Sequence, residues 1–254
     1  MTVPRLQMRD VTLRFGTLDV LDAASLTVRP GEFVSILGPS GAGKSTIFKL
    51  LTGGLRAEAG EVLVDGQPLA PEMRPFAFMP QRDALMPWRR IIDNTTLGLE
   101  VQDMRRAQAR AKVLPLFEEF GLLGFERHYP HQLSGGMRQR AALLRTVVQQ
   151  RPMLLLDEPF GALDALTRAG MQRWLESMWE RHRWTAMLVT HDVREAVHLS
   201  DRIYMLSPRP ARVIREIEID LPRPRGLSGP ARAEAAAIET AILAVLLQNQ
   251  EGNP

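Results

Sequence analysis

The stretch Glu32–Leu51, with the sequence EFVSILGPSGAGKSTIFKLL, decides the fold of this 254-residue chain. It starts with a short apolar run, passes through a glycine loop, and continues with apolar residues at helical spacing, which predicts a strand, a loop and a helix. The loop fits a pattern in which backbone N–H groups cradle phosphates, a lysine reaches the β and γ oxygens, and a hydroxyl holds Mg²⁺. A helix beginning at Gly43 would point its N-terminus at the anion. The stretch therefore predicts a phosphate-binding loop in an α/β fold.

Composition restricts the class of protein further. Hydrophobic residues make up 45% of the chain, which is enough to bury a sizeable core in one domain, with or without subdomains. No apolar stretch of 18 residues and no charged leader followed by an apolar run is visible, so we expect no membrane span and no secretion signal. The chain has no cysteine, which excludes disulfides and cysteine-ligated metals and fits a reducing cytosol.

The charged residues argue against a nucleic-acid partner. The formal net charge is +3, and the 29 arginines are scattered along the chain instead of forming one basic block. The chain has only three lysines, and one of them, Lys44, ends the glycine loop. A compact ammonium is not interchangeable with a guanidinium at such a position, so Lys44 is expected to act on a phosphate.

Further strands surround the loop segment in the sequence. Near-alternating apolar residues in Leu6–Phe15, and the runs Ser25–Val28 and Glu61–Asp65, predict an antiparallel sheet beside the central strand. Phe15 ends the first of these strands and could either stack on a nucleobase or belong to the core. Another apolar run, residues 76–80, ends at Gln81, which is either a site residue or an ordinary loop glutamine.

The middle of the chain, about residues 82–145, predicts a helical subdomain. Ile91–Leu99 and Met104–Phe120 show helical spacing, although Pro115 should kink or split the second segment. Trp88 precedes both in an expected loop and could be a docking residue or an internal prop.

A last helix of this subdomain is expected to begin after Ser134 as its N-cap. Gly135 and Gly136 lower the helix propensity of its first turn by roughly 1 kcal/mol each relative to alanine. That penalty suggests that something approaches the backbone closely, and a helix N-terminus attracts anions. The alternative is a loop that merely ends in glycines.

Two acids follow a buried strand in the second half of the chain. The run 152–156 is apolar and ends at Asp157 and Glu158, at the carboxyl end of a strand, where open α/β sheets bind ligands. Beside a phosphate-binding loop, Asp157 would belong to the Mg²⁺ shell, and Glu158 would orient or deprotonate a water molecule. Two solvated acids at a strand end are the alternative.

The remaining elements complete the sheet. Thr185–Thr190 predicts a strand that ends at His191, which could cap the following helix or reach a γ-phosphate. Ile203–Leu206 and Val213–Ile219 predict the last strands of a domain spanning residues 1–221. Residues 222–254 are expected to form a proline- and arginine-rich linker and an amphipathic helix from Ala231 to Leu247. This helix could pack on its own domain or join a dimer contact.

Taken together, these motifs in this order resemble the ATPase subunits of ATP-binding cassette (ABC) transporters, over roughly Leu6–Leu221. The resemblance implies an α/β P-loop NTPase core with an antiparallel β subdomain and an inserted α-helical subdomain. It implies that ATP is bound by Phe15, Gly38, Pro39, Ser40, Gly41, Ala42, Gly43, Lys44, Ser45, Thr46, Ser134, Gly135, Gly136 and Asp164. It implies catalytic roles for Glu158, His191, Gln81 and Lys44, and Mg²⁺ ligation by Ser45, Gln81 and Asp157.

The resemblance also implies partners and a location. In this family two subunits pack head to tail, so Ser134 of one copy would close on the γ-phosphate held by Lys44 of the other. The chain departs from the archetypal signature at Met137, where that signature has glutamine. Leu85–Asn94 and Thr190–Pro210 look most like the importer branch for nitrate, sulfonates and taurine, whose relatives include importers of thiamine precursors. Membrane-spanning permease chains, an extracytoplasmic solute-binding protein and a position on the cytoplasmic face of the inner membrane are therefore expected.

Two other classes remain as alternatives. One is a non-transport cassette ATPase that acts on DNA or ribosomes, and the other is a different P-loop phosphotransferase. DNA-repair members of the family carry a very long coiled coil before the signature, whereas Gln81 and Ser134 here lie only 53 positions apart. The signature helix argues against other phosphotransferases.

Overall fold

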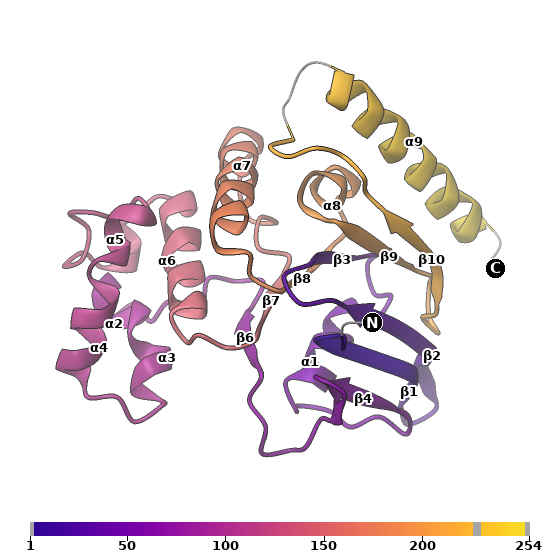
Figure 1. Cartoon of the computed structure of the whole chain (residues 1–254), viewed down its shortest axis with the longest axis horizontal. Helices are drawn as coiled ribbons and strands as arrows, with labels where there is room; N and C mark the ends of the chain where they lie inside the picture. Colours follow the sequence, from indigo (N-terminus) through magenta and orange to yellow (C-terminus); the bar gives the residue numbers. More distant parts are fainter. Residues whose placement is uncertain (1–2, 226–229, 252–254) are drawn as a thin grey trace.

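The central sheet carries the phosphate-binding loop, as expected. A computed structural model describes residues 3–225 and 230–251. The sheet contains β3 (Phe33–Leu37), β6 (Phe76–Met79), β7 (Met153–Asp157), β8 (Ala186–Thr190), β9 (Arg202–Leu206) and β10 (Val213–Glu218). Its strand order is β10-β9-β3-β8-β7-β6, and every neighbouring pair is parallel except β9 with β10. The carboxyl ends of β3, β6, β7 and β8 therefore lie at one edge of the sheet (Figure 1).

A second, antiparallel sheet flanks the first. It contains β1 (Leu6–Phe15), β2 (Leu18–Val28), β4 (Ala59–Val64) and β5 (Gln67–Pro68), in the order β2-β1-β4-β5. The predicted strand Ser25–Val28 covers only the last four of the eleven residues of β2. The first half pairs with the end of β1, and its residues Val20 and Leu21 are buried.

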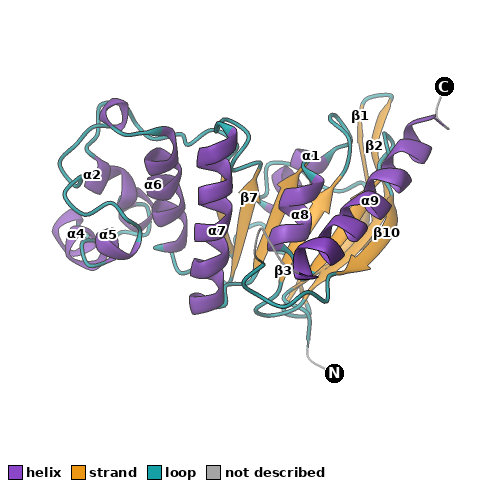
Figure 2. Ribbon diagram, turned by 90° about the horizontal axis from the view of Figure 1, so that it is seen from above, coloured by secondary structure: helices purple, strands orange, loops and turns teal. Residues whose placement is uncertain are grey.

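The helices fall into two groups (Figure 2). The helical subdomain contains α2 (Ile91–Thr95), α3 (Leu97–Glu100), α4 (Arg106–Val113), α5 (Leu116–Glu119), a 3₁₀ turn (Pro130–Gln132) and α6 (Gly135–Val147). Pro115 separates α4 from α5, which confirms the expected break. The other helices are α1 (Lys44–Leu51), α7 (Ala165–His182), α8 (Val193–Leu199) and α9 (Pro230–Glu251).

The core forms on both faces of the central sheet. Phe33 on β3 and Leu156 on β7 pack with the helical subdomain and α7, whereas Val34 and Ile36 of β3 pack with α1 and the antiparallel sheet. Alternate residues of β3 therefore serve opposite faces, as the two-residue period of a strand requires. A third cluster joins α8, β9 and α9.

The C-terminal helix packs on its own domain, which is one of the two alternatives raised by the sequence. The apolar stripe of this helix faces the domain: Ile242 is buried, and Ile238, Val245 and Leu246 pack beside it. The predicted helix Ala231–Leu247 is shorter than α9.

Residues 222–225 are not a free linker. The guanidinium of Arg225 is buried and donates to the carbonyls of Val197, His198 and Ser200 at the end of α8. Arg223 donates to the carbonyl of Leu199 at the same helix end. These arginines supply partners for carbonyls that a helix C-terminus leaves unpaired, so the segment is fixed to the domain.

Within residues 3–225 and 230–251, no helix combines the length and the apolar character that crossing a bilayer requires.

Candidate functional site

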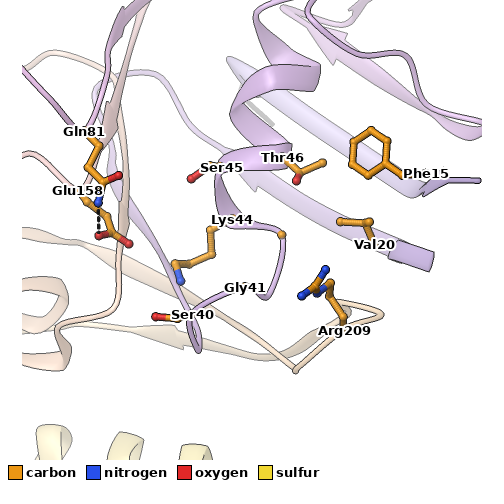
Figure 3. A pocket seen from close by; sticks show the side chains of 11 residues that line it. Phe15, Val20, Ser40, Gly41, Lys44, Ser45, Thr46, Gln81, Glu158 and Arg209 are labelled. Carbon is orange, nitrogen blue, oxygen red and sulfur yellow. Dashed lines mark hydrogen bonds between the residues drawn. The ribbon is translucent and has the colours of Figure 1, made fainter. Parts of the chain in front are cut away.

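A cavity of about 350 Å³ lies where the loop between β3 and α1 meets the end of β7 (Figure 3). Nine residues predicted from the sequence line it, together with two that were not: Phe15, Val20, Ser40, Gly41, Gly43, Lys44, Ser45, Thr46, Gln81, Glu158 and Arg209. The predicted residues Gly38, Pro39 and Ala42 belong to the same loop. The fold therefore brings the loop, the strand-end glutamine and the strand-end glutamate to one place.

The loop conformation depends on its glycines. Gly41 and Gly43 have φ angles of +79° and +92°, a region that favours glycine. A Cβ atom on Gly43 would lie 3.1 Å from Cγ1 of Val20, so a side chain there would also be crowded. Gly43 is the N-cap of α1 and offers no side-chain oxygen to the first turn. The first N–H groups of α1 thus lack a side-chain cap and suit an anionic ligand.

Lys44 is buried within its own loop. Its Nζ atom donates to the carbonyls of Gly38 and Pro39, both at 2.9 Å. Burial lowers the pKa of Lys44, while the nearby carboxylates of Glu158 and Asp157 act in the opposite direction. The two carbonyls hold a point charge at the cavity wall, where a phosphate oxygen could be recognised.

Ser45 and Asp157 are two of the three predicted magnesium ligands, and they lie side by side. Ser45 Oγ donates to Asp157 Oδ1 at 3.2 Å. Burial is the main reason why the pKa of Asp157 is raised, and the hydrogen bond from Ser45 opposes this shift. A divalent cation beside Asp157 would favour its charged form, and hydroxyl and carboxylate oxygens are hard donors of the kind Mg²⁺ prefers. These residues therefore fit the ion.

Glu158 contacts two polar side chains that follow neighbouring strands. Its Oε2 atom accepts a hydrogen bond from Gln81 Nε2 at 3.1 Å and lies 3.2 Å from Nδ1 of His191. The three residues follow the adjacent strands β7, β6 and β8, so the sheet sets their spacing. Glu158 has a φ of +43°, which is unusual for a residue other than glycine and is typical of functional sites. The cluster can hold a carboxylate in one orientation beside the loop.

The predicted signature residues lie elsewhere. Ser134, Gly135 and Gly136 do not line the cavity around Lys44. Ser134 is the N-cap of α6, and its Oγ atom accepts from the N–H of Met137 at 3.3 Å, as expected.

The two glycines have a packing role within the chain. A Cβ atom on Gly135 would lie 3.1 Å from a methyl group of Leu163, and one on Gly136 would lie 3.1 Å from the methyl group of Thr167. The start of α7 thus approaches α6 closely. Asp164, another predicted ATP ligand, also lies outside the cavity, and its Oδ1 atom caps α7 by accepting from Thr167 N–H at 3.0 Å.

Sequence reasoning missed Arg209 and Val20 as cavity residues. Arg209 follows β9 in a proline-flanked loop, and its Nη2 atom comes within 3.3 Å of a Cβ position on Gly41. Only the tertiary fold brings it to the loop, so no local pattern could have identified it. Phe15 is 48% exposed and lines the cavity, which excludes the alternative that it belongs to the core.

A glycine loop with a buried lysine, a serine–aspartate pair and a strand-end glutamate defines the site of a P-loop nucleoside triphosphatase. The family described as "ABC transporter" matches residues 21–161. The chain is 44% identical to the aliphatic sulfonates import ATP-binding protein SsuB of Cupriavidus necator over 92% of this chain and 76% of that protein. It is 39% identical to the formylaminopyrimidine import ATP-binding protein ThiZ of Halalkalibacterium halodurans over 90% of each. The chain belongs to the ABC transporter family and is an ATPase.

Solved structures agree with this assignment. The dimeric structure of a post-hydrolysis state of the ATP-binding cassette MJ0796, bound to ADP and phosphate, matches with a TM-score of 0.71. The sequence identity is 29%, and the match covers 84% of this chain and 98% of that one. The fold is therefore the ABC ATPase fold that the sequence predicted.

Proposed function

We propose that this chain is the ATP-hydrolysing subunit of a membrane importer for a small anionic or organic solute, such as nitrate, a sulfonate, taurine or a thiamine precursor. The observation that carries the ATPase part is the Glu158 carboxylate, which is held by Gln81 and His191 at the wall of the phosphate-binding cavity. The transport part rests on relatives named as import ATP-binding proteins for sulfonates and a formylaminopyrimidine. These names also favour transport over the alternative role on nucleic acid or ribosomes.

The geometry suggests how the residues divide the reaction. The loop N–H groups and Lys44 would bind the β- and γ-phosphates, and Glu158 would orient a water molecule and accept its proton. Gln81 and His191 would keep the Glu158 carboxylate in place. Ser45, Asp157 and Gln81 are the residues that would hold Mg²⁺, which neutralises charge on the phosphate oxygens when bound.

The proposed assembly contains two copies of this chain, membrane-spanning permease subunits and an extracytoplasmic solute-binding protein, with this subunit peripheral on the cytoplasmic face of the inner membrane. A second copy is needed because Ser134, Gly135 and Gly136 do not line the cavity that contains Lys44. The dimeric state of the related cassette supports this arrangement.

Growth experiments test the transport function. A strain lacking this gene should fail to use an aliphatic sulfonate as its only sulfur source, or a formylaminopyrimidine in place of thiamine. The intact gene should restore growth, and a Lys44→Ala copy should not. Normal growth of the deletion strain on nitrate and on each of the other solutes would contradict the proposed solute classes. Restoration by the Lys44→Ala copy would contradict an ATP-driven role.

A further inference from the structure

A second cavity, of about 270 Å³, lies between α7, α8 and α9 and takes no part in the proposed ATP site. In Figure 1, α8 lies between α7 and α9, and Figure 2 shows the same arrangement from above. The cavity wall contains five arginines and two acids: Arg168, Arg173, Arg194, Arg225, Arg232, Asp192 and Glu239. The wall therefore carries an excess of positive charge.

The two acids are already paired. Glu239 accepts from Arg232 at 2.6 Å and lies 3.7 Å from Arg194, and Asp192 lies 3.9 Å from Arg168. No described carboxylate is paired with Arg173, which is exposed on α7. The cavity thus has fewer carboxylates than guanidinium groups to neutralise.

Two buried donors of this wall lack a partner. The Nε atoms of Arg168 and Arg225 have no hydrogen-bond partner among the described residues, and Arg225 is only 5% exposed. Because these N–H groups have no acceptor, they leave positive charge at the wall without a close partner, which adds to the excess positive charge of the cavity. Glu176 is buried beside Arg225 and accepts from its backbone N–H at 2.9 Å, but the Nε atom of Arg225 still has no partner.

The pKa of His198 is affected by the same positive charges. It lines the cavity, and its pKa is lowered to about 4, first by burial and then by the charges of Arg225, Arg223, Arg173 and Arg232. A neutral imidazole at pH 7 leaves the arginines as the charge that a ligand meets.

We propose that this cavity binds a small oxyanion, of the sulfate, phosphate or sulfonate class, between α9 and the pair α7 and α8. Its size suits such an ion with water, and guanidinium groups match oxyanion geometry. Ala165 and Asp192 line the cavity and directly follow Asp164 and His191, so the anion would join α9 to the two segments that lead from predicted site residues. The site does not depend on the proposed transported solute.

Calorimetric titration of the full chain tests the proposal. Saturating ADP and Mg²⁺ should occupy the phosphate-binding loop, and the ionic strength should be held constant with chloride. Sulfate should then bind in the millimolar range, and Arg168→Gln/Arg173→Gln should weaken binding about fivefold or more. Arg181→Gln is the control for Arg173→Gln alone, because each removes one positive charge from α7 and Arg181 does not line the cavity but is paired with Glu119. It should leave the affinity unchanged.

Hydrogen exchange locates the bound anion. Amides of α9 should exchange more slowly when sulfate binds the parent protein, and should not respond in the double variant. If the double variant fails to fold, Arg173→Gln alone still tests the site. Absence of binding with ADP present, equal affinity in parent and variant, or unchanged exchange in α9 would each overturn the proposal.

Two possible sources of the anion can be distinguished by which anion binds more tightly. Titrations with inorganic phosphate and with methanesulfonate distinguish a product of ATP hydrolysis from an anion of the transported class, and tighter binding of either identifies that source. Failure of both to bind, together with sulfate, would overturn the site.

Discussion

At the scale of single residues, the proposed mechanism assigns hydrolysis to one carboxylate and nucleotide binding to other groups. Lys44 is held by loop carbonyls, whereas Glu158 is held by the side chains of Gln81 and His191, so different contacts fix the two proposed site residues. Glu158 also bonds through its own N–H to the carbonyl of Val189 on β8. The backbone of residue 158 should therefore keep its position when a substitution changes only the carboxylate.

We expect Glu158→Gln to reduce ATP turnover by about 100-fold or more while ATP binding remains, because the amide keeps the shape but cannot accept a proton. The variant should accumulate as an ATP-bound dimer. Steady-state phosphate release, nucleotide binding and size-exclusion chromatography with ATP measure these effects. Turnover within a few-fold of the parent would show that Glu158 is not the catalytic carboxylate.

Glu195 makes the stability of the fold depend on pH. It is buried in α8, where its Oε2 atom accepts from Thr190 Oγ1 at 2.7 Å. Burial raises the pKa of Glu195 from 4.5 to about 8, so the folded protein keeps a proton that the unfolded chain releases. The stabilising effect of this proton is fully present below pH 4.5 and is lost as the pH rises through 8.

We therefore expect Glu195→Gln, which is neutral at every pH, to weaken the loss of stability between pH 6 and pH 8 by roughly 2 kcal/mol relative to the parent. Urea unfolding of both proteins at the two pH values measures the difference. Parallel pH profiles would mean that Glu195 is ionised in the folded protein.

At the scale of elements, the sequence predicts the segments whose apolar residues follow a regular strand or helix spacing. It does not predict segments whose burial depends on contacts with distant parts of the chain. The strand, loop and helix around Lys44 follow from local pattern. By contrast, α7 was not predicted, although Met171, Leu175 and Met178 form a buried stripe at helical spacing, because arginines and glycine interrupt the pattern. The composition of residues 222–225 predicts a linker. Nothing in it shows that the guanidinium of Arg225 donates hydrogen bonds to carbonyls of α8.

The residues of the site likewise include some that the sequence could predict and some that it could not. Its loop and strand-end residues have fixed motif spacing and could be predicted, whereas Arg209 reaches the cavity from a loop far along the chain. The sequence also could not show that Leu163 and Thr167 account for close packing at Gly135 and Gly136.

The loop between β6 and α2 carries an exposed aromatic residue. Trp88 is 74% exposed, which is contrary to the alternative of an internal prop, and it precedes Arg89, whose guanidinium is fixed by Glu100 at 2.7 Å. A large apolar side chain held in the open on an anchored loop is typical of a contact with a partner. For an importer subunit, that partner would be the permease.

We expect Trp88→Ala to leave ATPase activity and thermal stability of the isolated subunit nearly unchanged, but to weaken permease assembly by about 2 kcal/mol or more. Leu123→Ala, another exposed apolar residue of the helical subdomain, is the control and should not weaken assembly. Thermal melts of the isolated subunit and pull-down with the permease measure the two effects. A large drop in melting temperature, with unchanged assembly per folded molecule, would contradict the docking role.

At the scale of the whole molecule, the chain has two parts of the proposed ATP site, and these parts do not meet. The cavity contains Lys44 and Glu158, whereas Ser134 caps α6 outside it. A symmetric head-to-tail dimer would complete each cavity with the α6 start of the other copy. Each of the two sites would then combine the loop of one chain with the signature of its partner.

Mixing inactive variants tests this arrangement. In a heterodimer of Ser134→Arg and Lys44→Ala subunits, both lesions fall in one site and the other site is intact. ATPase activity should therefore return to about a quarter of the parental value when equal amounts pair at random, because half of the dimers have one working site. Mixing Lys44→Ala with Glu158→Gln is the matched control. Both of those lesions belong to the cavity half of the site, so every heterodimer has one lesion in each site and should stay inactive. Recovery in the control as well, or no recovery in either mixture, would mean that the two sites are not independent composites of two chains.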